Sequence, residues 1–189
     1  MPDMFEFFWP PPPPIYDPAK AKALLTEAGY PNGFDAGYYT CDSSYANIGE
    51  AALGNLAQVG SRAKLRPLER AAFIEGYAGK KFRDIIQGAS GAFGNVATRM
   101  EAFVVKGGVY GSYPDIDALY PLQAVEGDHT KRAAILTEMQ KLVIDKAMYA
   151  PIWQLAFLNG VGKRVGESGL GLVKGNAYSA PYEDVNIKK

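Results

Sequence analysis

Apolar residues recur at helical spacing in several stretches of the chain, most clearly between Tyr16 and Phe34. Asp17 can accept hydrogen bonds from the first free amides of a helix, and Pro18 then falls at the first helical position. Gly29 stands where helices commonly end in a left-handed residue. The expected apolar face consists of Ala21, Leu24, Leu25 and Ala28. The pattern predicts a capped helix, a turn at 31–33 and a strand that begins at Phe34.

The next fifty residues continue as alternating strands and helices. Strands are predicted at 34–40, 63–67 and 82–87, and Pro67 places the second of them near a sheet edge. Residues 42–44 can cap a helix whose inner face carries Ile48, Ala52, Leu56 and Val59. A third helix is expected over 70–77, with Phe73 and Tyr77 stacked one turn apart. This order predicts the α/β class with right-handed crossovers.

The second half of the chain begins with a Gly-rich stretch, 88–113, that carries little regular signal and is expected to be a loop. Asp128 caps a long helix. The apolar face of that helix is Ala133, Leu136, Met139, Val143 and Ala147. A Gly-rich segment runs from residue 160 onward.

Composition excludes several classes of function. Twenty basic residues balance twenty acidic ones, so no charge field favours nucleic acid or an anionic membrane. Cys41 is the one cysteine, which rules out an internal disulfide and Cys-x-x-Cys metal clusters, and a single histidine further limits metal chemistry. We therefore expect no cofactor and no metal site. The first nine residues lack the basic region of a secretory signal, and no apolar run is long enough to span a bilayer.

An aromatic segment and a proline run precede the first helix. Residues 4–9 are rich in Phe and end in Trp9, and Pro10 to Pro14 must be extended polyproline. One interpretation is a connector whose aromatic side chains pack on the neighbouring body. The other is a small interaction module whose prolines bind a proline-recognising domain.

The segment Tyr-Asp-Pro-x-x-Ala-x-x-Leu-Leu-x-x-Ala-Gly-Tyr-x-x-Gly-Phe at 16–34 resembles the solute-binding proteins of ABC importers, in the family of dipeptide, oligopeptide and nickel receptors. Four further segments extend this resemblance. Residues 114–120 match the family's entry to a helix, and Asp128-x-x-x-Arg132 with Gln140 matches the helix that follows. Residues 150–154 match the strand after that helix, and residues 182–185 match the closing segment. It implies a mixed sheet with flanking helices, the second lobe of a type II periplasmic-binding-protein-like fold. It also implies a receptor outside the cytoplasm that captures a peptide or similar small polar solute for ABC permease subunits.

The resemblance covers only the second half of such a receptor. We therefore expect a Pro-rich connector at 1–15, a second-lobe α/β domain at 16–150, and a return segment at 151–189 toward a missing N-terminal lobe. On this interpretation the chain is an incomplete fragment. Trp153, Phe157 and Leu158 should then lose part of their packing surface.

The Gly-rich loop after the third predicted strand is the candidate ligand site. Its backbone groups can face a cleft, and the side chains that can bind a solute are Ser90, Phe93, Asn95 and Arg99, together with the backbone of Gly91. The peptide-binding members resembled here often carry a Trp and an Asp in this loop. The matching positions fall near Ala89 and on Gly91 or Ala92, so a free peptide amine lacks its acidic partner. Arg99 is expected either to clamp an anionic group or to form a surface ion pair.

Enzymatic alternatives start from the same loop. Gly88-Ala89-Ser90-Gly91-Ala92 comes close to the nucleophile elbow Gly-x-Ser-x-Gly, which makes a serine hydrolase using Ser90 the rival function. The last Gly is replaced by Ala92, and the one histidine, His129, is expected at the exposed start of a helix. The expectation is therefore a binding protein with no catalytic residues.

Overall fold

The structure is a computed structural model that describes residues 1, 3–89, 94–108, 110, 112–154, 158–170, 172 and 181–188. The chain divides into two compact units, which are described separately below. One unit comprises residues 13–90, and the other comprises residues 1–12 and 91–189. Residues 16–150, predicted as one second-lobe α/β domain, fall in both units: 16–90 lie in the first and 91–150 in the second.

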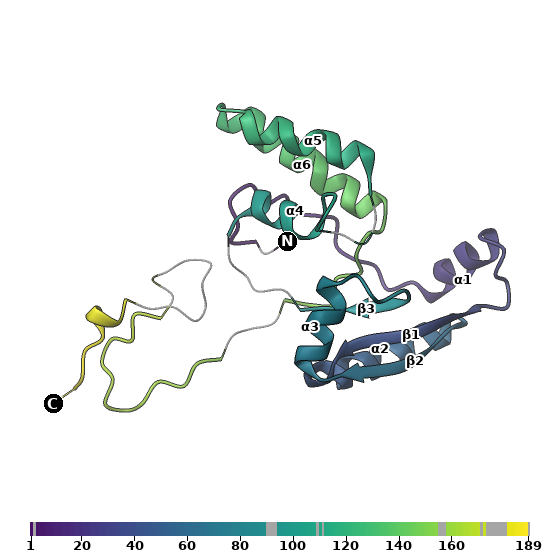
Figure 1. Cartoon of the computed structure of the whole chain (residues 1–189), viewed down its shortest axis with the longest axis horizontal. Helices are drawn as coiled ribbons and strands as arrows, with labels where there is room; N and C mark the ends of the chain where they lie inside the picture. Colours follow the sequence, from purple (N-terminus) through teal and green to yellow (C-terminus); the bar gives the residue numbers. More distant parts are fainter. Residues whose placement is uncertain are drawn as a thin grey trace. The chain divides into compact units, whose positions relative to one another are not determined.

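The unit of residues 13–90 is a three-stranded parallel sheet with helices (Figure 1). Its elements are α1 (Pro18–Glu27), β1 (Phe34–Asp42), the 3₁₀ turn η1 (Ser43–Tyr45), α2 (Ala46–Gln58), β2 (Ser61–Leu68), α3 (Arg70–Ala78) and β3 (Ile85–Gln87). The strand order is β2-β1-β3. The predicted α/β class and the order of elements are confirmed. Among the described strands all pairs are parallel, whereas the sequence suggested a mixed sheet.

Local sequence explains where these elements begin and end. The Asp17 carboxylate accepts from the Lys20 amide at 2.9 Å, and Gly29 adopts a φ of +89° just after α1. Gly60, with a φ of +90°, ends α2 in the same way. Pro67 lies on β2, which is an edge strand, and a missing amide costs nothing on a free edge. β3 is three residues shorter at its start than predicted.

α2 and α3 cover opposite faces of the sheet. On one face, an added Cβ at Gly49 of α2 would come within 2.7 Å of the Leu65 side chain and 3.1 Å of the Tyr39 ring, so a larger residue here would require these side chains to move. Arg66 follows Leu65 on β2 and faces the other side of the sheet. Its guanidinium lies over the ring of Phe82, which stacks on Phe73 of α3. Adjacent strand residues point to opposite faces, which fixes this arrangement.

The second unit contains α4 (Val96–Phe103), α5 (Pro114–Val125), α6 (His129–Asp145) and the 3₁₀ turn η2 (Tyr182–Asp184). Its core gathers buried side chains from the N-terminal segment, from α4 and the two residues after it, and from α5 and α6: Phe5, Val96, Ala97, Met100, Val104, Val105, Ile116, Leu136 and Met139. The predicted helices at 114–120 and after Asp128 are confirmed. The Asp128 carboxylate accepts from the Lys131 amide at 2.9 Å, as a cap should.

The prediction that 88–113 is a loop without regular structure was wrong, because α4 lies within it. Its signals were an N-cap at Asn95, the matching Thr98, and apolar residues at Val96 and Met100, four positions apart. Because glycines precede and follow this short helix, its sequence was interpreted as part of a loop.

Two predictions for the C-terminal part were also wrong. α6 ends at Asp145, and Ala147, expected on its apolar face, is exposed with a φ of +48°. Residues 150–154 do not form a strand; Trp153 is 54% exposed and Leu158 is 93% exposed. These two exposures agree with the expected loss of packing, and Phe157 lies outside the described residues. No helix among the described residues is long and apolar enough to cross a membrane.

The aromatic N-terminal segment packs on its own unit, as the connector interpretation predicted. Phe5 is 4% exposed and belongs to the core of α4–α6. The Gln140 side chain donates to the Phe7 carbonyl at 3.0 Å and accepts from the Trp9 amide at 3.3 Å. By contrast, all five prolines that follow are exposed.

Candidate functional site

The carboxyl ends of the three parallel strands form one edge of the sheet. Asp42 at the end of β1 is paired with Leu68 at the end of β2, and Cys41 is paired with Gln87 at the end of β3. The chain runs from central β1 to β2 on one side and then crosses to β3 on the other. Open α/β sheets bind ligands at the carboxyl ends of strands where the order reverses in this way.

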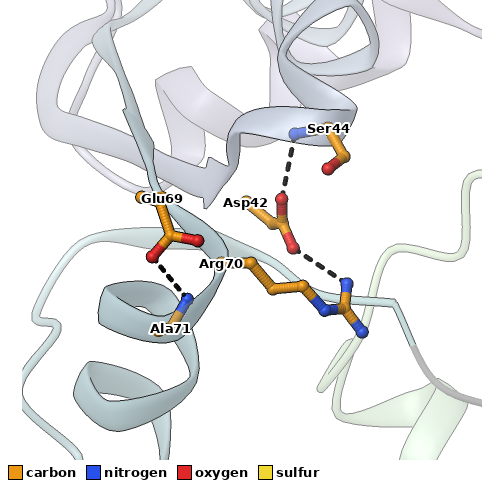
Figure 2. A network of polar contacts seen from close by, with 5 residues as sticks. All are labelled: Asp42, Ser44, Glu69, Arg70 and Ala71. Carbon is orange, nitrogen blue, oxygen red and sulfur yellow. Dashed lines mark hydrogen bonds and ion pairs between the residues drawn. The ribbon is translucent and has the colours of Figure 1, made fainter.

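A buried carboxylate organises this edge (Figure 2). One oxygen of Asp42 accepts from the Ser44 amide at 2.9 Å, and the other pairs with Arg70 Nη1 at 3.1 Å. The Asp42 side chain is 5% exposed, whereas that of Arg70 is 65% exposed. The hydrogen bond from the Ser44 amide, with the Arg70 charge added, lowers the pKa of Asp42. Glu69 beside this pair accepts from the Ala71 amide at 2.8 Å and caps α3.

The ends of β1 and β3 are also joined by side chains. The Tyr39 hydroxyl donates to Gln87 Oε1 at 2.9 Å, and Gln87 Nε2 donates to the Tyr45 carbonyl at 3.4 Å. Burial, with the neighbouring Cys41, raises the pKa of Tyr39. Burial also raises the pKa of the Cys41 thiol, which is completely enclosed and therefore poorly suited to nucleophilic chemistry. These bonds hold Gln87 in place where the chain enters the predicted ligand loop.

Of the five predicted ligand residues, Ser90, Gly91 and Phe93 lie outside the described residues. Asn95 is the N-cap of α4: its side chain accepts from the Thr98 amide at 3.1 Å, and Thr98 Oγ1 accepts from the Asn95 amide at 3.0 Å. This capping box gives Asn95 a structural role. Whether these residues touch a solute stays a prediction.

Arg99 is buried on α4, with 7% of its surface exposed. Its guanidinium carbon lies 5.5 Å from the ring centroid of Phe5 and 5.2 Å from that of Phe103. Burial lowers its pKa. This environment differs from that of an ordinary exposed arginine, and the predicted contact with an anionic ligand remains a prediction.

The structure places His129 at the exposed start of α6, as expected. Its Nε2 lies 3.3 Å from Glu6 Oε1, and its ring lies 4.7 Å from the ring of Phe7. Among the described residues no three His, Cys, Asp or Glu side chains are grouped so that they could hold a metal ion.

Sequence reasoning missed the roles of Arg70 and Gln87 and treated Asp42 only as a helix cap. The signal was available, because each of these polar residues stands at, or within three residues after, the end of a predicted strand. Parallel strands bring such ends to the same edge.

A separate open groove of about 340 Å³ lies near the amino ends of β1 and β2, lined by residues 30–33 and 57–60 with Lys22 and Leu25.

Comparison with known proteins agrees with this architecture. Residues 1–111 match the family of bacterial extracellular solute-binding proteins, family 5, middle region. The chain belongs to this family, and the predicted resemblance is confirmed. The glutathione-binding protein GsiB of Escherichia coli K12 is 38% identical over 78 residues, which are 39% of this chain and 14% of GsiB. The GsiB of Salmonella choleraesuis is 37% identical over the same length.

Solved structures of periplasmic binding proteins share the fold. Helicobacter pylori DppA, in complex with a peptide, superposes with a TM-score of 0.76 at 20% identity, covering 100% of this chain and 38% of DppA. The Escherichia coli murein tripeptide binding protein MppA gives a TM-score of 0.64 at 21% identity, covering 77% of this chain and 31% of MppA. The chain thus spans much less than two thirds of the length of these relatives.

Proposed function

We propose that this chain forms part of the solute receptor of an ABC importer and takes part in binding a peptide or a similar small polar solute. The observation that carries the proposal is membership of the solute-binding family over residues 1–111, a range that includes the carboxyl edge of the sheet and the loop that follows it. The partners would be ABC permease subunits and a further lobe of the same receptor. The site of action would be outside the cytoplasm.

The carboxyl edge supplies the groups that such a solute needs. Asp42 and Gln87 are held by hydrogen bonds and give the edge a fixed shape. The Arg70 side chain is largely exposed, and its guanidinium has donors beyond the one that Asp42 accepts. In the sequence, residues 88–99, which carry the predicted ligand residues, follow directly after the end of β3. Receptors of this architecture enclose their solute by hinge motion between lobes.

The finer part of the proposal is that the solute carries an anionic group near Arg99. The desolvation that lowers the pKa of this guanidinium also strengthens its attraction to an anion, because the local dielectric is low. Positions 89, 91 and 92 carry no acidic side chain, so a solute ammonium group has no acidic partner at these positions. This also favours a solute that binds through an anionic group.

The first test replaces Arg99 in the intact product of the reading frame that encodes this chain. Arg99→Ala should weaken binding of the solute by about 1.5–3 kcal/mol, the usual worth of a hydrogen bond to a charged group. Titration calorimetry measures this change, and circular dichroism checks that α4 still folds. Arg62→Ala is the matched control, because Arg62 is exposed near the amino end of β2, at the end of the strand opposite to the carboxyl edge. Equal affinities of Arg99→Ala and the wild type would remove Arg99 from the site.

We also propose that the chain is not an enzyme. The family is one of solute-binding proteins, and the Gly-x-Ser-x-Gly pattern around Ser90 is incomplete. Ester and peptide substrates should show no turnover above background. A turnover that disappears in Ser90→Ala would instead support the hydrolase alternative.

A further inference from the structure

The proline run connects the two compact units, and each of its ends is tied to a different unit. The boundary between the units falls at Pro12–Pro13, inside the run Pro10–Pro14. Five consecutive prolines form a polyproline II helix of about 15 Å, since each residue advances the chain by about 3.1 Å. Such a segment is stiff and cannot fold back on itself as a flexible linker would.

The first end is held by Gln140 of α6. Its side-chain amide donates to the Phe7 carbonyl and accepts from the Trp9 amide, so it pairs with the main chain immediately before Pro10. The same amide nitrogen also donates to the Leu136 carbonyl at 3.1 Å, which fixes the side chain against its own helix. Gln140 is 5% exposed, so water competes little for these bonds.

Packing around these hydrogen bonds strengthens the first anchor. Phe5 is buried in the core of the unit, and the Val96 amide donates to the Glu6 carbonyl at 3.4 Å. The guanidinium of Arg132 lies 5.5 Å from the ring centroid of Phe7, and the ammonium of Lys141 lies 5.9 Å from that of Trp9. Separating the segment from α4 and α6 would therefore expose core surface.

The second end is tied to the sheet unit two residues after the run. The Tyr16 hydroxyl donates to Gln58 Oε1 of α2 at 3.1 Å. Asp17 then caps α1, so the chain becomes helical at Pro18. Between the anchors at Trp9 and Tyr16, every residue is exposed.

We propose that Pro10–Pro14 is a rigid strut between the two units, with Gln140 as the positioning residue that clamps one end. A stiff segment with both ends held restricts the separation of its two attachment points while the units rotate. The strut itself does not depend on the proposed function; only its use, as a restraint on hinge motion during solute capture, rests on the receptor role.

The test is a distance measurement between spin labels in the whole chain, without ligand. Labels are attached at Glu50→Cys on α2 and Glu138→Cys on α6, both exposed positions, in a Cys41→Ala background. Replacing Pro11, Pro12 and Pro13 by glycine should broaden the distance distribution at least twofold. Pro31→Gly is the matched control, because this exposed proline lies in a turn within one unit and should leave the width unchanged.

A second variant tests the clamp. Gln140→Leu should also broaden the distribution and should speed exchange of the Trp9 amide at least tenfold, because that amide loses its acceptor. Gln58→Leu should leave Trp9 exchange unchanged. If Gln140→Leu does not fold, the triple glycine variant still decides the question, since its prolines are exposed. Equal widths for that variant and the wild type would overturn the strut, whereas a failure to bind peptides would overturn only the receptor role.

Discussion

Asp42 is the residue whose environment most directly links stability to pH. Its carboxylate is nearly enclosed, accepts the Ser44 amide and pairs with Arg70, and its pKa is lowered mainly by the amide hydrogen bond. A lowered folded-state pKa stabilises the fold at pH values above the unfolded value of about 3.9. That contribution disappears as the pH falls through the lower folded-state value.

We expect Asp42→Ala to lower the free energy of unfolding by about 1–3 kcal/mol at pH 7, the cost of losing bonds to a charged, buried group. The difference between variant and wild type should begin to shrink below about pH 4, where Asp42 becomes protonated in the unfolded chain, and should disappear as the pH falls through the lower folded-state pKa. Urea unfolding at pH 7 and pH 3 measures both effects. Glu75→Gln is the control: Glu75 pairs with Lys81 on the surface and should contribute nothing measurable. A pH-independent loss for Asp42→Ala would contradict this role.

At the scale of elements, two helical glycines should respond oppositely to alanine. An added Cβ at Gly76 of α3 would lie 2.5 Å from the Phe82 ring, which is itself stacked on Phe73 and buried. Gly76→Ala should therefore destabilise the fold by about 1–3 kcal/mol through overpacking. Gly54 of α2 has open space around it, so Gly54→Ala should stabilise by about 0.5–1 kcal/mol through helix propensity.

Thermal or urea unfolding of the two variants checks this pair of signs. Far-UV circular dichroism should show native helix content for both proteins. A stabilised Gly76→Ala would mean that α3 packs less closely on Phe82 than the structure shows.

The elements of the sheet unit were predictable because each carries its own local signal. Asp17 with Pro18 starts α1, Gly29 and Gly60 mark helix ends, and Pro67 marks an edge strand. All five residues act through neighbouring backbone groups. α4 was missed because its capping pair, Asn95 with Thr98, lies among glycines. The strand expected at 150–154 does not form, because a strand needs a partner to pair with and the local sequence does not specify that partner.

The candidate site was less predictable than the fold. Because the stretch after β3 is rich in glycine, the predicted ligand residues were placed at 90–99. Three of these five residues lie outside the described part of the chain. The edge formed by Asp42, Arg70 and Gln87 depends on three segments far apart in sequence. Only the strand order brings these residues to the same end of the sheet.

At the scale of the whole molecule, we propose that this chain contributes the carboxyl edge of its sheet to the binding site of a peptide receptor. On the proposed function, a further lobe of the receptor supplies part of the contacts to the solute, and the chain itself spans 14% of its relative GsiB. The isolated chain should therefore bind peptides at least tenfold more weakly than the intact product of its reading frame.

The most direct measurement is photo-crosslinking of a bound peptide to that intact protein. A defined library of tripeptides and tetrapeptides is first screened by native mass spectrometry, and the tightest binder is then remade with a photoreactive group. We predict micromolar or tighter binding and cross-links to residues 42–45, 70 or 88–99. Absence of binding by the whole library, or cross-links confined to the groove at 30–33 and 57–60, would contradict the account.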